Sequence, residues 1–214
     1  MTRAAKKTAP KESTQAKAKG SATAKAELPI IGFATPDDWS TWLAAHHDSS
    51  KGVWLKLGKK GSGLASIDYA QALQVALAWG WIDGQKRAHD ATAWLQRFTP
   101  RGPKSMWSQI NRDKALALIA SGEMKPSGLA EVERARKDGR WDAAYASASK
   151  AVVSPELQAA LAANPRAEKF FAALDAANRY SVLHRVNTAT TDETRQRRIA
   201  RLVEMLARHE KIHP

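Results

Sequence analysis

The stretch from Trp79 to Asn111 restricts the fold of this chain more than any other part of its 214 residues. It contains four of the eight tryptophans, whose large apolar rings favour burial. A helical pattern ends at Gly80, and two strand-like runs follow at 81–86 and 92–98, separated by a short polar turn. This order predicts an antiparallel hairpin directly after a helix. The chain therefore needs a fold in which helices pack against a sheet.

Two prolines separate the predicted hairpin from the next helix. Pro100 and Pro103 break the second strand, because proline cannot donate a hydrogen bond to a sheet. Ser105 is expected to cap a helix that runs to Gly122, since a serine hydroxyl accepts hydrogen bonds from the free amides of a first turn.

Two further strands are predicted before the hairpin. Residues 30–33 and 53–57 have strand-like patterns, and the second alternates apolar and polar side chains. Thr35 is expected to cap the first helix, and either Ser66 or Asp68 the second. These elements predict an α+β fold with a small antiparallel sheet packed with helices, followed by a helical C-terminal subdomain.

The composition changes after Trp141, the last tryptophan. Apolar residues then recur at helical spacing, and Thr190 and Glu193 have the spacing of a capping box before the last helix. We therefore predict three parts, namely a disordered basic tail at 1–27, a tryptophan-rich α+β domain at 28–141 and a helical subdomain at 142–214 packed on it.

The first 27 residues are basic and contain no aromatic residue. They include seven Lys or Arg and two Glu, so they carry +5 of the net charge of +13. Such a segment buries too little apolar surface to offset its ordering entropy, which predicts disorder. It either makes weak non-specific contact with nucleic acid or only solubilises the chain.

The sequence favours a cytoplasmic protein without a membrane span. No apolar run approaches the ~18 residues that a span needs, and the start of the chain lacks the apolar core of a secretory signal. His209 and His213 fit the His-Glu-x-x-His pattern of zinc proteases, but the chain ends at Pro214, where a helix would fray. No metal or cofactor is predicted.

Four sequence blocks carry a resemblance to a known family. AWGWIDG at 78–84, RFTPR at 97–101, MWSQIN at 106–111 and DETRQRRIARLVEML at 192–206 resemble the YdeI/OmpD-associated family, also called bacteriocin-protection proteins. The resemblance extends over about residues 30–214. It implies a bacterial protein without established catalysis, linked by name to envelope stress. His184-Arg185 lies in a segment where relatives often have a tryptophan-rich helix, so a site lined by that helix would be altered here.

The candidate ligand site is a tryptophan-lined pocket at the corner between hairpin and helix. Arginines beside a helix N-terminus suit phosphate or carboxylate, because the free amides and the guanidinium groups both donate to anions. Asp83 either pairs with Arg101 or orients a ligand hydroxyl. The alternative is a purely structural Asp83–Arg101 pair. The predicted ligand-binding residues are Trp81, Asp83, Arg97, Arg101, Ser108 and Asn111.

Other basic residues are candidate anion contacts, namely Lys59, Lys60, Lys104, Arg195 and Arg198. The first two lie in a glycine turn that lacks the order of a phosphate-binding loop. The two arginines form a basic helix face with Arg201, which either contacts phosphate groups or an acidic partner or is a solvated helix surface. The leading prediction is a non-enzymatic stress or bacteriocin-protection protein that binds an anionic small molecule or partner. The alternatives are a basic nucleic-acid-associated accessory protein and an enzyme that uses Asp83 as general base.

Overall fold

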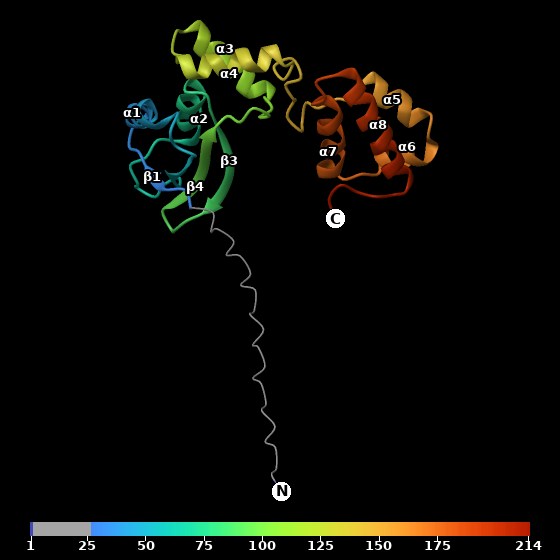
Figure 1. The fold of residues 1–214 in the computed structure, drawn as a ribbon, viewed down its shortest axis with the longest axis horizontal. Coiled ribbons are helices and arrows are strands. Elements are labelled where there is room, and N and C mark those ends of the chain that lie inside the picture. The colour runs from blue at the N-terminus through green and yellow to red at the C-terminus, as the bar shows by residue number, and fades with distance from the viewer. Residues whose placement is uncertain (2–26) are drawn as a thin grey trace.

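A computed structural model describes Met1 and residues 27–214, so the predicted tail lies almost entirely outside the described residues. Four strands and eight helices follow one another in this part of the chain (Figure 1). They are β1 (Ile30–Gly32), α1 (Pro36–His46), β2 (Val53–Gly58), α2 (Tyr69–Ala78), β3 (Trp81–Ala88), β4 (Ala93–Pro100), α3 (Gln109–Ala120), α4 (Pro126–Lys137), α5 (Pro155–Ala162), α6 (Pro165–Ala172), α7 (Ala176–Asn187) and α8 (Asp192–Ala207). The predicted α+β class is confirmed.

The sheet is mixed, with the strand order β1-β2-β4-β3. The predicted hairpin is present, because β3 pairs antiparallel with β4, and β4 in turn pairs antiparallel with β2. β1 pairs parallel with β2, so the prediction of an entirely antiparallel sheet is corrected at this edge. The reason is the connection between the two strands. α1 lies between β1 and β2 in the chain and is long enough to bring the chain back to the end of the sheet where β1 began, so β2 runs in the same direction as β1.

Local capping residues start the first two helices. Thr35 forms a capping box with Asp38, as its hydroxyl accepts from the Asp38 amide and the Asp38 carboxylate accepts from the Thr35 amide. Asp68 caps α2, while the Ser66 hydroxyl accepts from the Gly58 amide at the end of β2. Of the two predicted alternatives for α2, the carboxylate is therefore the cap.

Two predicted helix starts are wrong by a few residues. Ser108, not Ser105, caps α3, and the Ser105 hydroxyl accepts from the Gly102 amide within the preceding turn. Thr191, not Thr190, caps α8 through the Thr194 amide. In each case a neighbouring hydroxyl competes for the same role, and the fold of the loop decides which one reaches the helix.

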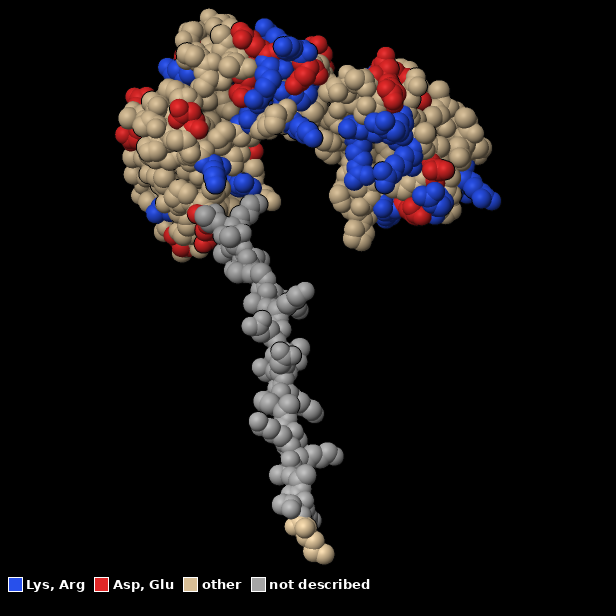
Figure 2. Space-filling model, in the orientation of Figure 1, with Lys and Arg blue, Asp and Glu red and all other residues tan. Residues whose placement is uncertain are grey.

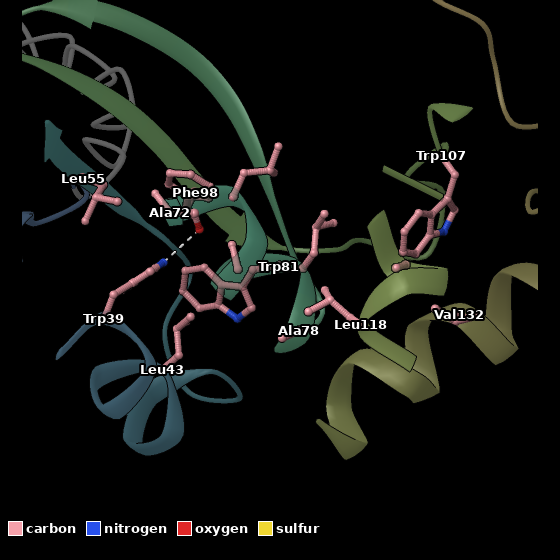
Figure 3. Close-up of a cluster of buried hydrophobic side chains, with 14 of the residues drawn as sticks. Trp39, Leu43, Leu55, Ala72, Ala78, Trp81, Phe98, Trp107, Leu118 and Val132 are labelled. Carbon is pink, nitrogen blue, oxygen red and sulfur yellow. Dashed lines mark hydrogen bonds between the residues drawn. The ribbon is translucent and has the colours of Figure 1, made fainter. Parts of the chain in front are cut away.

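The main core is shared by the sheet and α1–α4, with α3 and α4 packed on α2, and is built around tryptophans. Trp39 is fully buried and donates its indole hydrogen to the Ala72 carbonyl oxygen at 3.2 Å. Trp81 lies edge-on to Trp39, with the ring centroids 6.0 Å apart. Figure 3 shows Trp81 between Trp39 on one side and Leu118 on the other. Burial of these rings fixes how the helices sit on the sheet.

The four C-terminal helices have a hydrophobic cluster of their own. Leu157, Phe171 and Leu206 are buried in it, from α5, α6 and α8. Figure 1 shows these helices as a bundle beside the sheet-containing part. The Tyr180 hydroxyl in α7 donates to the Ala146 carbonyl oxygen at 3.0 Å, which joins the bundle to the connecting segment. The boundary at 141/142 stays a prediction.

Among residues 27–214, no helix is long and apolar enough to cross a membrane.

Candidate functional site

Asp83 lies at the edge of the sheet beside the first residue of α2. The Tyr69 hydroxyl donates to the Asp83 carboxylate at 2.8 Å. Burial, followed by the bond to Asp83 and its negative charge, raises the pKa of Tyr69, so the phenol stays protonated. Asp83 therefore pairs with a tyrosine, and among the described residues no hydrogen bond or ion pair joins it to Arg101, contrary to the prediction.

Arg101 is a buried cation, with 5% of its surface exposed. Its guanidinium donates to the Met106 carbonyl oxygen at 3.4 Å and lies over the Trp107 ring. Its Nε and Nη2 atoms have no hydrogen-bond partner within the described residues. Burial lowers the pKa of Arg101 to about 10, against the opposing effects of Glu131, Tyr145 and Asp83. The side chain supports the corner between β4 and α3 from inside, where a ligand has little access.

An ion network surrounds Arg101. Glu131 pairs with Arg134 within α4, and Arg134 also donates to the Arg101 carbonyl oxygen at 3.3 Å. Arg140 pairs with Asp138 and donates to the Ser105 carbonyl oxygen at 2.6 Å. Burial raises the pKa of Glu131, although Arg134, Arg101 and Arg140 lower it. These contacts tie α4 and the loop after it to the corner, which is a structural role.

Trp81 and Arg97 do not join Asp83 in a pocket, contrary to prediction. Trp81 is 1% exposed and donates to the His47 carbonyl oxygen, so it belongs to the core. Arg97 pairs in register with Trp54, and the adjacent Phe98 pairs with Asp83. Because neighbouring strand residues face opposite sides, Arg97 and Asp83 lie on different faces of the sheet.

Ser108 and Asn111 lie at the start of α3, beside the connecting segment. The Ser108 hydroxyl accepts from the Asn111 amide at 3.1 Å, and Ser108 bridges in parallel to Tyr145. Burial and the Asp83 charge raise the pKa of Tyr145, while Arg101 and Ser108 lower it. Tyr145 thus lies within electrostatic range of both Asp83 and Arg101, but Ser108 is occupied as a helix cap.

The three predicted lysine contacts are exposed and do not converge. The Lys59 ammonium donates to the Asp90 carbonyl oxygen at 2.7 Å, at the turn between β3 and β4. Lys60 follows in the same loop, and Lys104 lies in the turn before α3. The sheet separates the loop at the β3–β4 turn from the corner at Arg101, so these lysines do not form one site.

In the described part of the chain, several arginines instead line one cavity between α7 and α8. Its volume is about 550 Å³. Figure 2 shows lysine and arginine side chains clustered over these two helices. We call it the arginine pocket, and it is lined by His184, Arg185, Thr188, Arg198, Arg201, Leu202, Met205, Arg208 and Glu210. Four arginines against one carboxylate give it a positive lining.

Hydrogen bonds hold two of these arginines in place. Arg198 donates to the Arg185 carbonyl oxygen at 2.7 Å and to the Thr188 hydroxyl at 3.3 Å, so it caps the C-terminal end of α7. Arg208 makes two hydrogen bonds to Glu210, at 2.9 and 3.2 Å. Within residues 27–214, Arg185 and Arg201 have no side-chain partner, which leaves their guanidinium groups free for a ligand.

Comparison with protein families assigns the two parts of the chain separately. Residues 31–131 match a domain of unknown function (DUF8412), and residues 150–209 match the family described as bacteriocin-protection, YdeI or OmpD-associated. Residues 150–209 form a YdeI/OmpD-associated domain. No curated protein and no solved structure matches the chain.

The YdeI/OmpD-associated domain is shorter than the resemblance implied. Of the four sequence blocks, only DETRQRRIARLVEML at 192–206 lies inside it, and the other three lie within 31–131. The domain includes α5–α8, and thus the arginine pocket apart from Glu210. The family resemblance is confirmed for this part of the chain.

The pocket of the YdeI/OmpD-associated domain contains one of the two arginines predicted there. Arg198 lines it, whereas Arg195 pairs with Glu156 and Asp192 and does not. Sequence reasoning missed Arg185 and Arg208 as pocket residues. A signal existed, because positions 198, 201, 205 and 208 recur at helical spacing on one face of α8. His184-Arg185, noted as a departure from relatives, does line the pocket.

The His-Glu-x-x-His segment follows α8 and fastens the end of the domain. α8 ends at Ala207, and His209 has a φ of 57°, so the two histidines do not share a helix. Buried Asn178 in α7 accepts from the Ile212 and His213 amides at 3.0 and 2.9 Å. His213 also contacts the Ser181 hydroxyl at 2.8 Å. Among the described residues, no group of three or more potential ligands gathers for a metal ion.

Proposed function

We propose that the chain is a non-enzymatic binding protein for anions, and that the arginine pocket of its YdeI/OmpD-associated domain is the binding site. The observation that carries this proposal is the convergence of four arginines on one cavity of about 550 Å³. Guanidinium groups bind phosphate and carboxylate through paired, charge-assisted hydrogen bonds. Following the family's description, we assign this binding to a role in bacteriocin protection.

The chemistry of the lining favours binding over catalysis. Arginine keeps its proton at neutral pH and does not serve as an acid or a base. The one group there with an ordinary pKa near neutrality is His184, whose pKa is lowered by burial, Arg198 and Arg185. Asp83, the predicted general base of the enzyme alternative, lies in the other part of the chain and accepts from Tyr69.

The size of the cavity favours a compact anion. Arg185 and Arg201 come from different helices and face one space, so a single phosphate or carboxylate group between them would satisfy both. A nucleic-acid backbone presents phosphates in a row and would extend beyond the pocket. The nucleic-acid alternative therefore predicts binding that depends on length and steeply on salt.

Isothermal titration calorimetry with inorganic phosphate and pyrophosphate, at low ionic strength, tests the proposal. Arg201→Gln should weaken binding about tenfold or more, since a hydrogen bond to a charged group contributes about 1.5–3 kcal/mol. Arg197→Gln is the matched control, because Arg197 lies on the same helix, is exposed and does not line the pocket.

If Arg201→Gln and Arg197→Gln lose the same amount of affinity, the loss reflects only the lower net charge, and the proposed site is overturned. Failure of both probes to bind the full chain would overturn the function. Binding of single-stranded DNA with an affinity that increases with length, together with no binding of pyrophosphate, would favour the nucleic-acid alternative instead.

A further inference from the structure

Strand β3 contains a bulge that brings an acidic and a basic side chain to one face of the sheet. Asp83 pairs with Phe98, and Lys86 pairs with Gln96, with a register shift between the two pairs. Residues three apart in a regular strand face opposite sides. Here both partners lie two apart on β4, so Asp83 and Lys86 face the same side.

A buried glutamine holds this bulge in place. The Gln96 side-chain amide donates to the Gly84 carbonyl oxygen at 2.8 Å and to the Gln85 carbonyl oxygen at 3.3 Å. Gln96 is 4% exposed, so these hydrogen bonds are shielded from water. The bulged residues are thereby fixed, and the positions of Asp83 and Lys86 beside them are fixed as well.

Two aromatic rings complete a cleft at this place. Tyr69 and Trp94 have ring centroids 6.3 Å apart and an angle of 41° between their planes. Tyr69 is 39% exposed, and its hydroxyl is held by Asp83. The cleft has a volume of about 490 Å³ and is lined by Tyr69, Asp83, Gly84, Lys86, Trp94 and Gln96. It presents aromatic surface next to polar groups on a rigid support.

The charges of this cleft balance, unlike those of the arginine pocket. It contains one carboxylate and one ammonium, and no ion pair joins Asp83 to Lys86 in the described part of the chain. A carboxylate only accepts hydrogen bonds, and an ammonium only donates them. A hydroxyl group does both, so a ligand with several hydroxyls can satisfy the two side chains without bringing a charge.

We propose that this cleft binds a neutral polyhydroxylated ring of the saccharide class. The apolar C–H face of the ring packs on Trp94 and Tyr69, and its hydroxyls donate to Asp83 and accept from Lys86. Aromatic side chains provide large contact area at a low cost in conformational entropy. This site is independent of the arginine pocket, because its lining comes from α2, β3 and β4.

The test is a titration of the full chain with maltotriose and, separately, with chitotriose. Two-dimensional NMR of the tryptophan indole groups monitors each titration. A Trp94→Phe variant assigns the Trp94 signal. We expect a saturable shift of that signal with at least one of the two saccharides. Lys86→Met should weaken the affinity at least fivefold, whereas Lys60→Met, an exposed lysine outside the cleft, should leave it unchanged.

Asp83→Asn should also weaken saccharide binding, and Asp48→Asn is its exposed control. Because the loss of Asp83 also disturbs Tyr69, the Lys86 variant keeps the test valid if Asp83→Asn fails to fold. The proposal is overturned if neither saccharide moves the Trp94 signal, or if Lys86→Met binds as well as the wild type. A shift with glycine zwitterion but with neither saccharide would also overturn it, in favour of an amino-acid ligand.

Discussion

The guanidinium carbon of Arg101 lies 3.5 Å from the centroid of the Trp107 ring. Both side chains are buried, and the pair lies where β4 ends and the chain turns toward α3. A cation over an indole ring is the strongest arrangement of this kind, because the face of the ring is electron-rich. The relationship makes Arg101 part of the internal support of the fold, next to the network of Glu131 and Arg134.

Arg101→Ala is expected to destabilise the protein by about 3 kcal/mol, because it removes a buried cation and leaves Glu131 with less compensating charge. Urea unfolding followed by tryptophan fluorescence measures this change. Lys104→Ala, in the exposed turn nearby, should stay within about 0.5 kcal/mol of the wild type. A stable Arg101→Ala protein that has lost phosphate binding would instead return Arg101 to a ligand site.

Gly128→Ala is expected to destabilise the protein by about 2 kcal/mol, although alanine favours helices. Gly128 lies in the first turn of α4, where an added Cβ would overlap the Ala78 carbonyl oxygen at the end of α2 and lie 2.5 Å from the Met124 sulfur. Gly102→Ala is the control, because its Cβ would meet only the Ser105 hydroxyl, at 3.7 Å. Thermal unfolding compares the two, and equal melting temperatures would show that α4 moves freely against α2.

Stability should fall as the pH drops below about 6.5, in part through His184. Its ring lies against Tyr145 and Tyr180, and burial, Arg198 and Arg185 lower its pKa in the folded protein below the ordinary 6.5. The unfolded chain therefore takes up the proton first as the pH falls, which favours unfolding. His184→Gln should reduce the loss of stability between pH 8 and pH 5, measured by urea unfolding. An unchanged loss of stability in His184→Gln would mean that other groups set the acid sensitivity.

Asn178→Ala should release the C-terminal segment from α7. The Asn178 side-chain oxygen accepts hydrogen bonds from the Ile212 and His213 amides, and its side-chain nitrogen donates to the Asp175 carboxylate. Loss of these buried hydrogen bonds should cost about 1–3 kcal/mol and remove the protection of both amides in hydrogen-exchange measurements. Gln196→Ala, on the exposed face of α8, should change neither quantity. Retained protection in Asn178→Ala would mean that other contacts hold the segment.

Much of the fold could be predicted because its signals are local. The capping box of Thr35 and the Trp81–Ala88 and Ala93–Pro100 hairpin each depend on residues close together in the chain. The predicted site was less accurate, since it grouped residues by their closeness to one corner. Arg97 and Phe98 are neighbours in sequence, yet the pleat of β4 sends them to opposite faces.

The sequence by itself determined the α+β class, the hairpin, most helices and the kinship of the C-terminal part, because periodicity, caps and motif order are local properties. Only the tertiary structure decided that Arg101 is buried, that Arg185 and Arg201 share a cavity, and that a bulge turns Asp83 and Lys86 to one face. The physical reason is that burial and convergence depend on how separate elements pack. A charged side chain has the same local pattern whether the fold turns it outward or covers it.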